Sequence, residues 1–172
     1  MKKRYRTRSR LAVSSLVVVG AVVLLASPAW AHVEVDPGSA PKGATQAFSF
    51  RVPNEEPTVV TVKLDVQFPT DHPFAHVLVQ AKPGWTFTTE TETLSKPIKT
   101  DDGSVTTAVT RVTWTATAGG IPPGAYDLFP VLAGLPTDTA KLTFKAIQTY
   151  SNGEVVSWIE TPAPGAQAHQ SP

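Results

Sequence analysis

His32 has the most distinctive chemical position in the sequence, because it directly follows Ala29-Trp30-Ala31. A small-x-small tripeptide is typical of a signal-peptidase site, so cleavage after Ala31 would make His32 the first residue of the mature chain. An N-terminal histidine offers two nitrogen ligands, its α-amine and its imidazole Nδ1, which close a chelate ring on one metal ion. The amine titrates near pH ~8, so a strongly binding metal can displace its proton at neutral pH. Nitrogen and carboxylate ligands in a tetragonal plane favour Cu(II), and Ni(II) less well.

A third ligand for such a site should be a hard anion, because the mature chain has no sulfur ligand. The sequence has no Cys, which excludes a blue-copper centre, and its single Met is the first residue. Glu55 and Glu56 follow a predicted strand in a proline-stiffened segment, and Glu34 and Asp36 are the other acids near His32. The residues alone leave the choice open, and the simpler interpretation of each acid by itself is a solvated surface carboxylate.

The other three histidines are weaker candidates. His72 and His76 are four residues apart, which is a metal-pair spacing on a helix, but Pro73 and the alternating sequence after it favour a turn and a strand. We interpret both as structural or surface residues, with a second, weaker metal site as the alternative. His169 stands alone in the C-terminal tail and carries no prediction of its own.

Composition excludes several classes of function. Six of the 15 basic residues lie within residues 1–10, so residues 32–172 carry nine basic against 14 acidic residues, a net charge of about −5. A mildly acidic domain is a poor candidate for binding nucleic acid, and would suit a cationic partner better. The sequence contains no nucleophile elbow, P-loop, dinucleotide fingerprint or HExxH motif. We therefore expect a protein that is not an enzyme.

Residues 1–31 have the order of a secretory signal peptide: a basic segment, an apolar run over residues 11–26, and the Ala-Trp-Ala site. A retained membrane anchor is the alternative, although the run is short for a span. No second apolar run follows. We expect an exported protein, either secreted or periplasmic and envelope-associated, whose mature chain does not span a membrane.

The mature chain is dominated by period-two alternation, which predicts strands with one buried and one wet face. We expect an all-β fold, an antiparallel β-sandwich of immunoglobulin or cupredoxin type with about eight or nine strands. The domain should cover residues 32–160, and a Pro/Ala/Gln-rich tail over 161–172 should be disordered. The expected strands are Thr45–Val52, Val60–Phe68, Ala75–Ala81, Trp85–Thr89, Val105–Thr117, Tyr126–Leu132, Lys141–Tyr150 and Val155–Glu160.

Two turns in this pattern are hairpin signals. Asp101-Asp102-Gly103 is one, and Asn152-Gly153 suggests a type I′ turn that would set Ile147 across from Trp158. Trp85 and Trp114 are expected in the core.

Five stretches, in order along the mature chain, resemble the YcnI-like family of exported bacterial copper-binding domains. They are Ala31-His32-Val33-Glu34-Val35, Phe50-Arg51-Val52-Pro53-Asn54-Glu55, Lys82-Pro83-Gly84-Trp85-Thr86, Ile121-Pro122-Pro123-Gly124 with Tyr126 and Phe129, and Asn152-Gly153-Glu154-Val155-Val156-Ser157-Trp158.

The resemblance implies a β-sandwich with one Cu(II) per mature chain in a monohistidine brace. Carried over by motif, the metal ligands are His32 and Glu55, with Trp158 close to the metal. Glu56 is the alternative ligand if the turn is shifted by one residue. Trp158 cannot itself ligate through its indole N–H, which is a donor only, so its role would be to shield the site, stack near the cation or hydrogen-bond the carboxylate. The alternative is that Trp158 is an ordinary core aromatic.

The function that follows is a metallochaperone-like role in copper homeostasis or acquisition. The family resemblance implies an envelope copper transporter or another copper chaperone as the partner. The alternative is a metal-free envelope β-sandwich that binds a protein or glycan through exposed aromatics such as Tyr126, Phe129 and Trp85.

Overall fold

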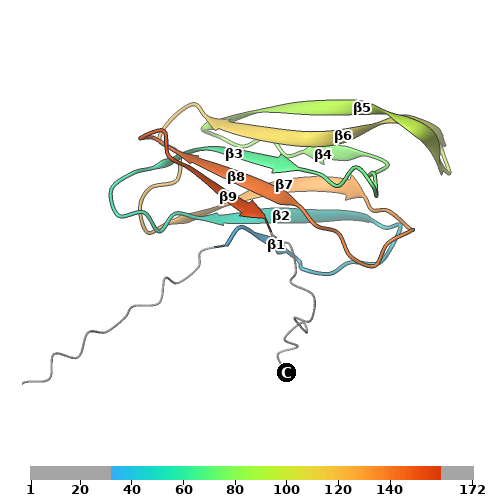
Figure 1. The fold of residues 1–172 in the computed structure, drawn as a ribbon, viewed down its shortest axis with the longest axis horizontal. Coiled ribbons are helices and arrows are strands. Elements are labelled where there is room, and N and C mark those ends of the chain that lie inside the picture. Colours follow the sequence, from blue (N-terminus) through green and yellow to red (C-terminus); the bar gives the residue numbers. More distant parts are fainter. Residues whose placement is uncertain (1–31, 160–172) are drawn as a thin grey trace, which may run out of the picture.

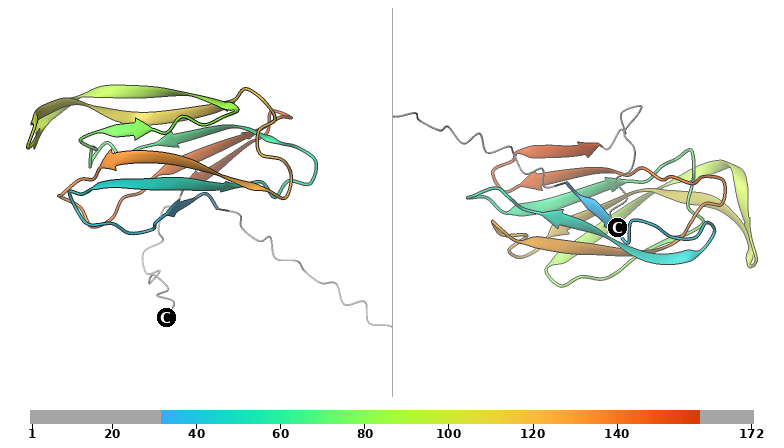
Figure 2. Two further views of the ribbon diagram at one scale, coloured as in Figure 1. Left: turned by 180° about the vertical axis from the view of Figure 1, so that it is seen from behind. Right: turned by 90° about the horizontal axis from the view of Figure 1, so that it is seen from below.

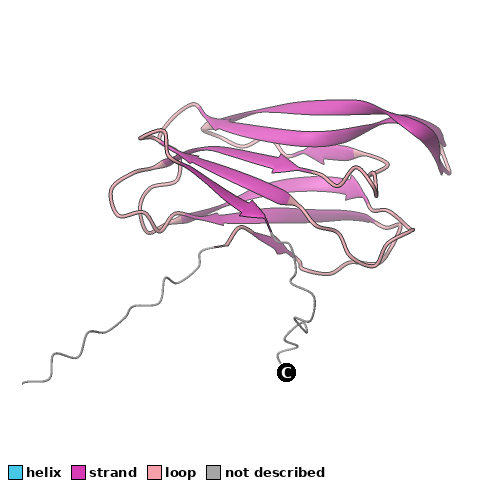
Figure 3. Cartoon of the chain, in the orientation of Figure 1, coloured by secondary structure: helices cyan, strands magenta, loops and turns pink. Residues whose placement is uncertain are grey.

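The computed structural model describes residues 32–159, which form nine strands and no helix. Figure 1 and Figure 3 show two packed sheets, which confirms the predicted all-β sandwich. The strand orders are β1-β2-β7-β4 and β5-β6-β3-β8-β9, and all pairings are antiparallel. The strands are β1 (Glu34–Asp36), β2 (Thr45–Pro53), β3 (Thr61–Gln67), β4 (Val77–Val79), β5 (Trp85–Thr100), β6 (Gly103–Ala116), β7 (Tyr126–Gly134), β8 (Lys145–Tyr150) and β9 (Val155–Ile159).

The expected signal peptide over residues 1–31 and the expected tail over 161–172 lie outside the described residues. Within residues 32–159, no helix is long and apolar enough to cross a membrane.

The core lies between the two sheets and is built from the alternate residues of each strand. An aromatic cluster occupies its centre, where Phe50 meets Phe144, Phe68 and Trp114 edge-on at ring-centroid distances of 5.2, 6.2 and 6.2 Å. Such edge-to-face pairs add to the free energy gained by burying the rings. Trp114 is fully buried, and the half-buried Trp85 packs edge-on against Phe129 at 4.9 Å, so both tryptophans belong to the core as predicted.

The surface aromatics expected for an adhesive face are only partly present. Phe129 is completely buried and Trp85 is largely used in packing against it, whereas Tyr126 is 63% exposed. The difference follows from the alternation of β7, in which Phe129 points inward while Tyr126 and Leu128 point outward.

The β5–β6 hairpin is much longer than the sequence pattern indicates. β5 runs from Trp85 to Thr100, where the sequence predicted a strand ending at Thr89. Most of its side chains are exposed, so its distal half has no buried face to produce an apolar alternation. The predicted turn is present, because Thr100 pairs with Gly103 across Asp101-Asp102. Figures 1 and 2 show the hairpin projecting beyond the rest of the sandwich.

The β8–β9 hairpin forms at Asn152-Gly153, but its turn is not type I′. Gly153 has φ +87°, no non-glycine residue described has positive φ, and Gly153 N–H donates to Tyr150 O at 2.9 Å. These features define a three-residue loop with a type I turn and a glycine bulge. The extra residue shifts the register by one, so Trp158 pairs with Ala146 and the predicted pairing with Ile147 is wrong.

The start of β3 lies close to the backbone of the segment that precedes β7. Thr61 and Ile121 form a bridge with two hydrogen bonds of 2.9 and 3.0 Å. The neighbouring Gly120 has φ +78°, and a Cβ placed on it would overlap the Thr61 carbonyl oxygen. Only glycine fits there, because both its conformation and the space exclude a side chain.

We expect Gly120→Ala to lower the free energy of unfolding by about 3 kcal/mol or more, because left-handed strain and a backbone clash add together. Chemical denaturation of residues 32–172 measures this. Gly119→Ala is the matched control, since Gly119 has φ +72° and no atom within 4 Å of its Cβ position. The control should lose only the conformational part, about 1–2 kcal/mol. Equal losses in the two variants would contradict the clash.

Candidate metal centre

His32 lies at an edge of the sandwich where the outermost strands of the two sheets come together. β1 is an edge strand of one sheet and β9 is an edge strand of the other. Figure 1 shows the end of β9 close to β1, and Val33 and Trp158 line the same groove beside this seam. The rings of His32 and Trp158 are 5.4 Å apart between centroids, with an interplanar angle of 54°. The fold therefore brings together two residues that are 126 positions apart in the sequence.

The segment that carries Glu55 begins beside His32. β1 is antiparallel to β2, with Glu34 opposite Arg51. Extending this register by two residues brings His32 level with Pro53, the last residue of β2. Glu55 follows two residues later, so His32 and the glutamate segment share one end of the sandwich.

Gln148 connects this glutamate segment to the tryptophan. The residue is fully buried in β8, and its Nε2 donates to Pro53 O at 3.0 Å and to Thr61 Oγ1 at 2.7 Å. Its Oε1 accepts a hydrogen bond of 3.1 Å from Trp158 Nε1. The indole N–H of Trp158 therefore donates to Gln148. It does not donate to a carboxylate, which was one of the roles considered for Trp158.

Asn54 fixes the loop that holds Glu55 and Glu56. It is buried, and its Nδ2 donates to Val59 O and Ile121 O, each at 2.8 Å. Its Oδ1 accepts from Glu56 N–H at 3.0 Å. Because the amide holds both ends of the turn, the loop backbone has little freedom. Glu55 is exposed and Glu56 is half-buried.

The two glutamates contribute to a negative environment around Tyr150. Burial is the main reason that the pKa of Tyr150 is raised, and the charges of Glu56, Glu154 and Glu55 raise it further. The carboxylates of the loop and of the β8–β9 turn therefore lie close enough to act on one phenol. A concentration of negative charge at this end would attract a cation.

Glu34 and Asp36 are less suited to the site than Glu55 and Glu56. Glu34 is ion-paired with Arg51, whose pKa is raised mainly by the hydrogen bond to Glu34 and then by its charge. Asp36 lies opposite Ser49, further along β1 from His32.

The residues that come together fit a brace. Among the described residues there is no group of three or more His, Asp or Glu side chains that could hold a metal ion. A brace needs only two such side chains, because the first residue contributes its amine as well as its imidazole. If His32 were the first residue of the mature chain, its amine and imidazole with a glutamate of the Asn54 loop would be a chemically sufficient donor set for Cu(II).

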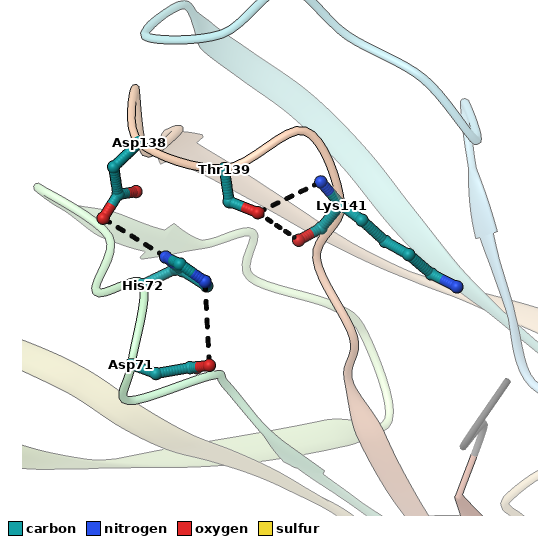
Figure 4. A network of polar contacts seen from close by, with 5 residues as sticks. All are labelled: Asp71, His72, Asp138, Thr139 and Lys141. Atoms are coloured by element: carbon teal, nitrogen blue, oxygen red, sulfur yellow. Dashed lines mark hydrogen bonds and ion pairs between the residues drawn. The ribbon is translucent and has the colours of Figure 1, made fainter. Parts of the chain in front are cut away.

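Neither His72 nor His76 belongs to a group of three or more metal-ligating side chains among residues 32–159. Figure 4 shows His72 between Asp71 and Asp138, with ion-pairing distances of 3.7 Å from Nε2 and 3.2 Å from Nδ1. His76 instead packs so closely over Gly134 that a Cβ on this glycine would be 2.7 Å from its ring. His72 is half-buried and His76 is exposed, which is compatible with the structural or surface roles predicted for them, and His169 lies outside the described residues.

Sequence reasoning missed Gln148 and Asn54. The signal for Gln148 was its position, because it stands between Ala146 and Tyr150 on the inward face of a strand. A polar amide at an inward position must find partners, since buried polar groups are almost always hydrogen-bonded. Asn54 gave a weaker signal, as a residue that favours turns directly after an apolar strand.

The fold and this edge define a class of protein: an immunoglobulin-like β-sandwich with a histidine, a tryptophan and a glutamate loop at one edge. The chain belongs to the family described as "Domain of unknown function (DUF1775)", whose model matches residues 32–172. This agrees with the resemblance identified from the sequence.

Two proteins illustrate the relationship. The chain is 32% identical over 141 residues to "Copper-binding protein CutI" of Bacillus subtilis (strain 168), a match that covers 82% of this chain. The chain spans 61% of the length of that curated relative. It is also similar to the crystal structure of a Nocardia farcinica protein described as having an immunoglobulin-like fold. That structure shares 32% identity and a TM-score of 0.61, over 79% of this chain and 89% of the other.

We expect Glu56→Gln to lower the pKa of Tyr150, because Glu56 is the largest charged contributor to its upward shift. Since the folded-state pKa is raised, the stability that Tyr150 contributes is complete below its ordinary pKa of about 10. That stability is lost between the unfolded value and the raised folded value, so both proteins begin to lose it near pH ~10. Because its folded pKa is less raised, the variant should lose less stability and complete the loss at a lower pH than the wild type. Ultraviolet titration of the tyrosinate band and alkaline unfolding measure the two effects.

Tyr150→Phe identifies which tyrosinate transition belongs to this residue. Glu92→Gln, on the exposed β5, is the control and should leave the transition unchanged. An unchanged transition in Glu56→Gln would show that the loop does not lie near Tyr150 in solution.

Proposed function

We propose that this chain is an exported Cu(II)-binding protein with a metallochaperone-like role in copper homeostasis or acquisition. One observation carries the proposal: the ring of His32 lies 5.4 Å from that of Trp158, at the end of the sandwich where the Glu55 loop begins. In the proposed site, the mature protein holds one Cu(II) through the amine and imidazole of His32 and a carboxylate of Glu55.

Two comparisons support this proposal. The relative from Bacillus subtilis is named a copper-binding protein. The family match begins at His32, which is the residue that the predicted cleavage would leave at the N-terminus. Export is part of the proposal, because the amine ligand exists only after a signal peptide has been removed.

The small number of protein ligands favours exchange of the metal over permanent storage. Two residues leave coordination positions open to water or to a ligand from another protein. We therefore propose that the metal is cargo, received from or passed to an envelope copper transporter or another copper chaperone. The proposed role is binding and transfer of the metal, not catalysis.

The first test is a Cu(II) titration of residues 32–172 followed by calorimetry and electron paramagnetic resonance. We expect one tightly bound Cu(II) with a tetragonal nitrogen and oxygen spectrum, because the free amine and imidazole chelate the metal. The matched control carries one extra Gly before His32, which moves the amine away from the imidazole. Equally weak binding by both forms would overturn the proposal.

Variants in the Asn54 loop distinguish the two possible carboxylates. Glu55→Gln should weaken binding by about 10-fold or more, consistent with loss of an anionic ligand, whereas Glu56→Gln should have a smaller effect. Glu154→Gln is the control, because this exposed turn residue also contributes negative charge near Tyr150. A larger loss of affinity in Glu56→Gln than in Glu55→Gln would make Glu56 the ligand. Equal small losses in all three variants would show that the loop only adds negative charge and supplies no ligand.

A second candidate function is supported by the outer face of the first sheet. Four large apolar side chains are exposed there on the adjacent strands β4 and β7. They are Leu78 (60% exposed), Leu128 (38%), Leu132 (38%) and Tyr126 (63%). Exposed apolar patches often mark interaction sites. If this face, and not the metal, defines the function, then binding to an envelope protein or glycan would be the same with and without the extra Gly.

A further inference from the structure

Gln148 occupies an unusual position for an amide side chain. Its exposed fraction is 0%, and its hydrogen bonds reach three strands: β2 through Pro53, β3 through Thr61 and β9 through Trp158. β2 belongs to one sheet, whereas β3, β8 and β9 belong to the other. A single buried side chain thus connects the two layers at the edge that contains His32.

We propose that Gln148 is the positioning residue of the metal centre. Its amide sets the orientation of the Trp158 ring over His32 and at the same time anchors the backbone from which the Glu55 loop departs. The inference rests on the proposed copper site, but the arrangement of Gln148, Trp158 and Pro53 is a property of the protein without metal.

The chemistry of the amide explains why this position requires glutamine. An amide has two N–H donors and a carbonyl acceptor. Both donors are used, by Pro53 O and Thr61 Oγ1, and the carbonyl accepts from Trp158. Methionine has a similar shape but would leave all three partners unpaired in the interior, and a carboxylate would keep the acceptor and lose the donors.

The position of Trp158 depends on this bond for a geometric reason. Trp158 lies on β9, an edge strand, and is only half-buried, so packing surrounds it less completely than a core residue. Its N–H bond to Gln148 is the polar contact that fixes the rotation of the indole. Without it, the ring can turn away from His32, and Pro53 loses its tie to the second sheet.

The test compares Gln148→Met with the wild type, both as residues 32–172. In the metal-free proteins, we expect the tryptophan emission to shift to longer wavelength and acrylamide quenching to increase, because Trp158 becomes more exposed. Trp158→Phe identifies the part of the signal that comes from this residue. In the Cu(II) titration, the dissociation constant should rise by about 10-fold or more, as for other residues that orient metal ligands. The copper hyperfine spectrum should change as well.

Two controls separate positioning from general loss of stability. Val112→Ala removes packing from a buried position on β6 in the same sheet. It should lower the melting temperature without changing the copper spectrum or the emission of Trp158. Gln148→Glu keeps the acceptor for Trp158 but loses both donors, so it should preserve the emission better than Gln148→Met and still weaken copper binding.

A double-mutant cycle completes the test. If Gln148 acts through Trp158, the effects of Gln148→Met and Trp158→Phe on copper affinity will be less than additive. The inference is overturned if Gln148→Met leaves emission, affinity and spectrum like those of the wild type, or changes them no more than Val112→Ala does. Absence of Cu(II) binding by the wild type would instead overturn the proposed function. In that case, the emission data alone would still decide whether Gln148 orients Trp158.

Discussion

A buried polar group without a hydrogen-bond partner destabilises the folded state, and this constraint determines how the end of the sandwich that contains His32 is built. Two amides, Gln148 and Asn54, are almost completely buried there. Gln148 bonds to three other strands, whereas Asn54 bonds to its own loop and to the distant Ile121. The two layers can close at this edge only in an arrangement that satisfies both amides together. Apart from Thr61 and Asp65, the rest of the buried core is apolar and aromatic. Apolar contacts tolerate small displacements much better than a set of directed hydrogen bonds.

This constraint explains how a site can be precise although its parts come from distant strands. His32 precedes β1, the glutamate loop follows β2, and Trp158 lies on β9. Gln148 ties the end of β2 to β9, and Asn54 ties the loop to Ile121 and Val59. The proposed centre therefore has few metal ligands, and many hydrogen bonds hold the segments that carry them. Metal sites depend on such outer partners for ligand orientation as well as on the ligands themselves.

The features that the sequence predicted correctly are those with a local signature. Period-two alternation is a property of each strand, so the β-sandwich and most of its strands could be identified without knowing their neighbours. The missed features depend on relationships between segments. The strand partner of Trp158 was predicted wrongly because the loop of the β8–β9 hairpin is one residue longer than expected. The length of β5 could not be inferred because most of its side chains are exposed. His32 could be proposed from the sequence because its signal is chemical and local. Gln148 was missed because its role exists only once β2, β3 and β9 have met.

In the proposed site, His32 supplies the amine ligand, and residues from distant strands hold the other parts in place. This difference determines when the proposed site could first bind copper. Before cleavage, the nitrogen of His32 belongs to a peptide bond and is not the basic amine that a brace requires. The amides, the tryptophan and the glutamate loop are all internal to the chain, so their arrangement does not depend on cleavage. Folding would therefore build the support, and proteolysis would add the last ligand to it. In this scheme the chain remains a poor copper ligand until its leader has been removed, and afterwards the site needs no further rearrangement, because Trp158 and the glutamate loop are already held in place.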